Sequence, residues 1–173
     1  MDLLPGFARW IHVWAGITWV GLLYYFNFVQ VPALKEAAAD GTAAGITRHV
    51  APRALLWFRW AAVVTWVAGA ALLGKAFVPA FTLQEDYAAI GVGAWLGTIM
   101  LFNVWVLIWP NQKKILGMVP ADDAAKARAR RVAFLASRTN TMLCPHDFFH
   151  DKWTDAPRYF RALGFLYCCK RRH

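Results

Sequence analysis

The side chain best suited to chemistry in this sequence is His12, which lies in an otherwise apolar stretch near the N-terminus. On a helix, the same face one turn further along carries Ala15 and Gly16, followed by Trp19. A His with small neighbours and a Trp is a candidate haem ligand through its imidazole. The alternative is a neutral His at the membrane interface that hydrogen-bonds to a neighbouring helix or to a lipid headgroup.

Three amide side chains form a second group of candidates, namely Asn27, Gln30 and Asn103. Each lies in or near an apolar segment, where hydrocarbon offers no hydrogen-bond partner. They could line a small-molecule site, or they could join helices, each contact contributing about 0.6–2 kcal/mol.

The remaining His and Cys residues do not predict a metal site. His49 falls in a polar connection about a membrane thickness, ~30 Å, from His12, so the two cannot share one metal within one protomer. His146 and His150 are four residues apart, but two ligands at this spacing are a weak signal. The three Cys residues contain no C-x-x-C pair and indicate neither a disulfide framework nor a zinc module: Cys144, Cys168 and Cys169.

Three apolar segments must position these residues, at about 11–31, 57–77 and 88–109. Each has about the 20 residues that a helix needs to cross a hydrocarbon core of ~30 Å. Pro32 and Pro110 directly follow the first and third segments and are expected to end them.

A different kind of helix is expected over about 121–139. Asp122 and Asp123 suit a helix N-terminus, and the basic residues that follow indicate a water-exposed, amphipathic helix on the cytoplasmic side. The sequence thus divides into a membrane domain over 1–143 and a divergent polar tail over 144–173.

The composition supports a membrane protein, since 59% of residues are hydrophobic and 17% are charged. The net charge of +9 does not point to nucleic acid, because no nucleic-acid-binding motif is present and the basic residues flank apolar segments. Ten basic residues belong to the first and third connections and their margins: Lys35, Arg48, Arg53, Arg59, Lys113, Lys114, Lys126, Arg128, Arg130 and Arg131. The N-terminus and the second connection hold only two, Arg9 and Lys75. The positive-inside rule therefore places the first and third connections in the cytoplasm and the N-terminus outside an inner membrane.

The predicted fold class is all-α: a polytopic membrane helix bundle in the lipid bilayer, with three transmembrane helices, a cytoplasmic amphipathic helix and a polar tail. Three spans with several Gly and few polar contacts bury little surface, so homo-oligomerisation or a protein partner is expected.

Three stretches resemble the urate oxidase N-terminal membrane domain family, which is the membrane part of a bacterial urate hydroxylase. They are RWIHVWAGITWVGLLYYFNF (Arg9 to Phe28), NVWVLIWPNQKKI (Asn103 to Ile115) and ASRTNTML (Ala136 to Leu143), and the resemblance covers roughly residues 7 to 143. Pro-Asn-Gln after a span is the most specific part. The signature residues are Asn103, Pro110, Asn111, Gln112, Arg138 and Asn140.

This resemblance implies an oxidoreductase of purine catabolism that oxidises urate and passes electrons to a cytochrome c or another acceptor. Fused members carry a C-terminal cytochrome c domain, but this sequence has no C-x-x-C-H haem attachment motif. The first span also resembles protoporphyrinogen oxidase-like and copper-resistance-like membrane domains. These favour a haem-binding or structural module without purine chemistry.

The tail departs from the family, which continues into an apolar span after Thr141-Met142-Leu143. Pro145 to His150 can be encoded as CCC CAT GAC TTT TTT CAT, and a reading frame one base later, with a G next, gives Pro-Met-Thr-Phe-Phe-Met. We therefore hypothesise a one-base frameshift near Cys144, which would make the chain a truncated, non-functional form. Resequencing the gene tests this hypothesis.

Overall fold

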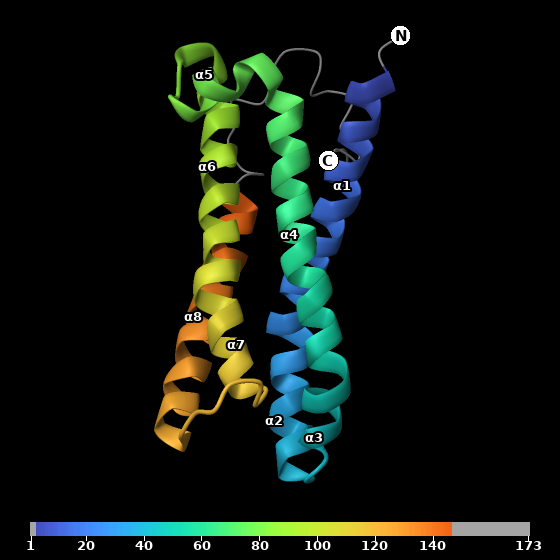
Figure 1. The fold of residues 1–173 in the computed structure, drawn as a ribbon, viewed down its shortest axis with the longest axis vertical. Coiled ribbons are helices and arrows are strands. Elements are labelled where there is room, and N and C mark those ends of the chain that lie inside the picture. The colour runs from blue at the N-terminus through green and yellow to red at the C-terminus, as the bar shows by residue number, and fades with distance from the viewer. Residues whose placement is uncertain (1–2, 147–173) are drawn as a thin grey trace, which may run out of the picture.

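Three long helical rods form most of the computed structural model, which describes residues 3–146 (Figure 1). The first rod contains α1 (Leu3–Tyr24), η1 (Tyr25–Gln30) and α2 (Val31–Ala39). The second contains α3 (Ala43–Gly45), η2 (Ile46–Val50), α4 (Ala51–Leu73), η3 (Gly74–Ala76) and α5 (Phe77–Phe81). The third contains η4 (Glu85–Tyr87), α6 (Ala88–Phe102), η5 (Asn103–Ile108) and α7 (Trp109–Ile115), and α8 (Asp123–His146) follows it.

The rods confirm the all-α membrane fold. The stretches Gly6–Ala39, Ala43–Phe81 and Glu85–Ile115 are each long and apolar enough to cross a membrane, and no strand occurs in the described residues. The predicted spans lie within these three helices. Many large apolar side chains on their outer faces are exposed, as contact with lipid requires.

Pro32 and Pro110 do not end their helices, contrary to the prediction from the sequence. The first rod continues beyond Pro32 to Ala39, and the third continues beyond Pro110 to Ile115. The physical reason is a widened, π-helical turn just before each proline: η1 before Pro32, η2 before Pro52 and η5 before Pro110. In each case the residue before the proline donates its N–H to the carbonyl five residues back, which accommodates the ring that would otherwise clash within an α-helical turn.

The connections between the rods are short. Gly41 (φ 72°) turns the chain between the first two rods, and Gly117 (φ 75°) follows the third. Both angles lie in the left-handed region that glycine adopts without strain.

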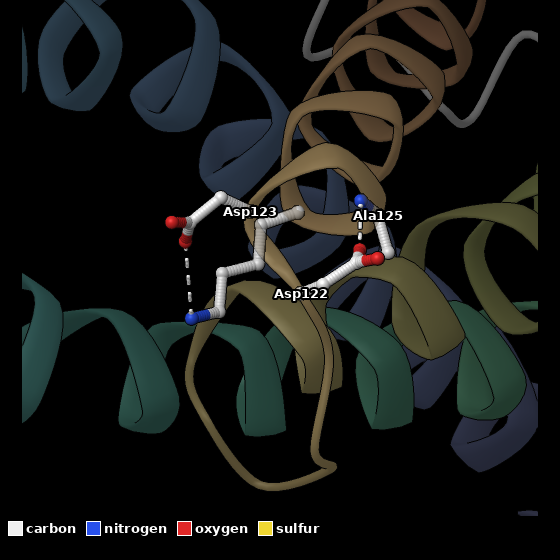
Figure 2. A network of polar contacts seen from close by, with 4 residues as sticks. Asp122, Asp123 and Ala125 are labelled. Carbon is white, nitrogen blue, oxygen red and sulfur yellow. Dashed lines mark hydrogen bonds and ion pairs between the residues drawn. The ribbon is translucent and has the colours of Figure 1, made fainter.

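Acidic residues begin α8, as the sequence predicts. The Asp122 carboxylate accepts a hydrogen bond of 2.6 Å from the Ala125 backbone N–H, and Asp123 forms an ion pair of 3.7 Å with Lys126 (Figure 2). These contacts satisfy an N–H group at the helix N-terminus and place negative charge there.

The structure changes the interpretation of this fourth helix. It extends to His146 rather than ending near 139, and it packs along α7 and η5 and against α1 and α6. The helix is not surrounded by water, because one face is buried in the bundle at Ala129, Ala133, Ala136, Asn140 and Cys144. Small side chains spaced by three or four residues allow this close approach.

Helix α8 occupies only part of the bundle length. It starts at the end that holds the α2–α3 turn and finishes near mid-height, behind α6, whereas the N-terminus and α5 lie at the opposite end (Figure 1). The apolar core lies where α8 joins the other helices, and its members are Trp19, Leu23, Phe58, Ala61, Ala62, Met100, Val104, Ile108, Ala136 and Cys144.

Candidate functional site

A buried polar seam connects α8 to the first and third rods. On one side, Asn27 Nδ2 donates to Ser137 Oγ at 2.8 Å. On the other, Asn103 Nδ2 donates to Asn140 Oδ1 at 2.8 Å, and Asn140 Nδ2 donates to the Met100 carbonyl at 3.1 Å. We use the name amide seam for the four side chains Asn27, Asn103, Ser137 and Asn140.

Three of the four amide-seam side chains are buried, and Ser137 is half-buried. Asn140 has no exposed surface, and Asn27 and Asn103 are both buried. Ser137 and Asn140 are one helical turn apart on α8, so they face the bundle together. In a membrane interior each of these groups needs a protein partner, and the seam supplies it.

Widened turns carry the two amides that reach α8. Asn27 lies within η1 and Asn103 begins η5. Asn27 Nδ2 also donates to the Leu23 carbonyl at 2.9 Å, a backbone group in the turn before the widening. Widened turns of this kind are frequent at functional sites, because they redirect side chains without ending the helix.

A second contact continues the polar face of α8 one turn beyond Asn140. The buried Cys144 side chain interacts with the Tyr24 hydroxyl of α1. Since Tyr24 precedes Asn27 while Cys144 follows Ser137, α1 and α8 run antiparallel here, and the polar face extends toward mid-height of the bundle.

Three buried polar atoms in the described residues have no hydrogen-bond partner: Gln30 Oε1, Trp19 Nε1 and Trp105 Nε1. Gln30 is in η1 and Trp105 in η5, the same two turns that carry the seam amides. Unpaired buried groups are costly, and in native proteins they often mark a place where a ligand or water binds.

His12 does not belong to the amide seam. It lies near the opposite end of α1, where its Nδ1 is 2.8 Å from the Thr65 backbone carbonyl of α4. Gly69 makes room for the ring, because a Cβ there would lie 3.0 Å from His12 Cε1. His49, in η2, is exposed and lies at the far end of the bundle from His12.

The signature residues separate into two groups. Asn103 and Asn140 contact each other, whereas Asn111 bonds locally to the Leu107 carbonyl at 2.7 Å. Pro110 and Gln112 belong to α7 at the end of the third rod, and the exposed Arg138 guanidinium lies over the Phe134 ring at 5.1 Å.

Sequence reasoning found three of the four seam residues but missed Ser137. Its spacing could have identified it, because Ser137, Asn140 and Cys144 are three and four residues apart and therefore lie on one face of a helix. A further contact was also missed: the Arg59 guanidinium of α4 stacks over the Trp109 ring of α7 at 3.7 Å.

No cluster of three or more His, Cys, Asp or Glu side chains that could hold a metal ion occurs among residues 3–146. Cys168, Cys169 and the His146–His150 pair lie outside the residues whose side chains the structure describes, as does the rest of the predicted polar tail.

Comparison with known proteins identifies the region that contains most of the seam. Residues 75–145 match the family described as urate oxidase N-terminal. The match covers two of the three stretches that carry the resemblance and includes Asn103, Ser137 and Asn140. It does not extend to the stretch from Arg9 to Phe28. A search of curated proteins and a search of solved structures gave no match.

Proposed function

We propose, from the urate oxidase N-terminal domain that this chain carries over residues 75–145, that it is the membrane part of a urate-oxidising system. In this proposal the chain belongs to an oxidoreductase of purine catabolism. Hydroxylation of urate by water releases two electrons and two protons, and the electrons pass to a cytochrome c.

The observation that carries this proposal is that three of the four amide-seam residues, Asn103, Ser137 and Asn140, lie inside the matched region. Asn103 and Asn140 come from stretches that resemble the family, and they bond directly to each other. Urate presents carbonyl and N–H groups alternately around its rings, and a carboxamide offers one donor group and one acceptor. Side chains of this type therefore suit recognition of a purine.

The unpaired atoms add to this support. Gln30 Oε1 can accept from a purine N–H, and the indole N–H of Trp105 can donate to a purine carbonyl. Aromatic side chains also suit a flat ligand, and Trp105 already packs edge-on against Trp60 with ring centroids 5.6 Å apart.

A urate-consumption assay in membranes tests the function. We expect urate loss from membranes that contain the chain, and faster loss when cytochrome c is added. Asn103→Leu should reduce the rate by at least about tenfold, equivalent to about 1.4 kcal/mol of transition-state stabilisation. Thr139→Val is the matched control, because its side chain is exposed on α8 and bonds only to the Leu135 carbonyl. No urate loss in the presence of cytochrome c and folded protein would contradict the proposal.

We also propose that the chain lies in an inner membrane with its N-terminus outside. The structure places the N-terminus and α5 at one end of the bundle, and the α2–α3 turn and the α7–α8 connection at the other (Figure 1). This pairing agrees with the distribution of Lys and Arg.

Thiol labelling in intact cells tests the orientation, in a background in which the native Cys residues are replaced. An impermeant maleimide should label Leu83→Cys, in the outer connection, but not Gly117→Cys. The reverse pattern would invert the proposed topology.

A further inference from the structure

The environment of His12 gives it the arrangement of a metal-binding imidazole. A backbone carbonyl only accepts hydrogen bonds, so the contact of 2.8 Å to the Thr65 carbonyl means that Nδ1 carries a hydrogen. In the neutral ring Nε2 then has a free lone pair. Histidines that bind metals usually donate their other N–H to a carbonyl or carboxylate in this way, which fixes the tautomer and the ring orientation.

Nε2 is the nitrogen left for a ligand. Within residues 3–146 it has no hydrogen-bond partner, and it is not among the fully buried polar atoms. The imidazole is held on one edge by α4 and is only half-buried.

Small residues surround the ring. Gly69 of α4 faces the ring edge, and a Cβ there would lie 3.2 Å from Nδ1. On α1, the positions one turn before and after His12 are occupied by Ala8, Arg9, Ala15 and Gly16, of which only Arg9 is large. The space left by Gly69 is taken up by the imidazole itself, and on α1 a ligand at Nε2 meets one large neighbouring side chain, that of Arg9.

The number of available ligands indicates which kind of metal fits. A bare Zn²⁺ or similar ion needs three or four protein ligands, and residues 3–146 offer no such cluster. Iron in a porphyrin already has four nitrogen ligands and needs only an axial imidazole from the protein. Its apolar ring also suits a membrane helix surface.

We propose that His12 Nε2 is the axial ligand of a haem, at the place where the N-terminal half of α1 packs against the C-terminal half of α4. Thr65 fixes the imidazole through its backbone carbonyl, and Gly69 leaves space for the imidazole ring. Trp19 lies two turns further along the same face of α1, about 10 Å away by helix rise, where its indole N–H is buried and has no hydrogen-bond partner among the described residues. This site does not depend on the urate proposal.

Haem titration of the full chain in detergent tests the site by its absorption spectrum. The wild-type chain should give a sharp Soret band that saturates at one haem per chain. His12→Gln keeps an N–H that can donate to the Thr65 carbonyl, so the fold should persist while the iron ligand is lost. Its haem affinity should fall by at least about tenfold, the lower end of the cost of disturbing residues that orient a metal ligand.

Two further variants make the result specific. His49→Gln alters an exposed His at the other end of the bundle and should bind haem like the wild type. His12→Gly should regain the Soret band when free imidazole is added, because imidazole can take the place of the missing side chain. Equal haem binding by the wild type and His12→Gln, with both folded by circular dichroism, would overturn the proposal. Urate consumption is measured separately, so failure of one proposal does not affect the other.

Discussion

Replacing Asn140 with Leu is the most direct test of the amide seam. Asn140 has no exposed surface and forms two interhelical bonds, one from Asn103 Nδ2 at 2.8 Å and one to the Met100 carbonyl at 3.1 Å. Leu has a similar volume but no polar atom, so it removes both bonds without leaving a large cavity.

The magnitude follows from these two bonds. An interhelical hydrogen bond in a membrane bundle contributes about 0.6–2 kcal/mol, and leaving the buried Asn103 donor without a partner costs about 1–3 kcal/mol more. We therefore expect Asn140→Leu to lower the free energy of unfolding by about 2–7 kcal/mol. Asn103→Leu should cost less, because Asn140 keeps its bond to the Met100 carbonyl.

The double variant gives the decisive measurement. With both residues replaced by Leu, neither amide is left unpaired, so the loss should be smaller than the sum of the single losses by about 1–2 kcal/mol. Reversible unfolding in mixed detergent micelles, followed by helicity, measures all three values, with Thr139→Val as an exposed control on α8. Losses that add within about 0.5 kcal/mol would show that the two amides do not share a bond in the folded protein.

Two other predictions concern packing at the two ends of the bundle. Gly91→Ala should destabilise the chain by about 1–3 kcal/mol, because the new Cβ would overlap the Ala80 carbonyl oxygen of α5. Gly97 has open space around it, so Gly97→Ala should be neutral or stabilising by up to about 1 kcal/mol. Equal thermal midpoints for the two variants would contradict this prediction. Arg59→Leu should lower the free energy of unfolding by about 0.5–2 kcal/mol and shift the tryptophan fluorescence, because it removes the guanidinium that lies 3.7 Å from the Trp109 ring centroid. An unchanged emission spectrum would count against this stacking.

The helices themselves could be predicted from the sequence because the membrane constrains them strongly. A charge-free run of about 20 apolar residues has few alternatives to a spanning helix, since every backbone group must bond within the segment. The start of α8 was predictable for a local reason as well. Asp122 and Asp123 precede a helical stretch, and an acidic residue there can satisfy free N–H groups.

The position of α8 could not be predicted in the same way. Its charge pattern indicated a surface helix, because Arg128, Arg130 and Arg131 lie close together in sequence. The face that packs into the bundle is marked only by small residues such as Ala129 and Ala133, and alanine suits exposed and buried helix faces equally well. The Asn103–Asn140 contact depends on this packing, so no local pattern contained it.

The prolines show why a rule from soluble proteins gave the wrong helix ends. In water, a helix can end at a proline because solvent bonds to the freed carbonyls, whereas hydrocarbon cannot replace those bonds. A widened turn keeps the chain helical, as the bonds from Val31 to Phe26 and from Trp109 to Val104 show. The same two turns carry Asn27 and Asn103 toward α8. We infer that Pro32 and Pro110 act on the seam through backbone geometry, by setting the turns from which its amides extend.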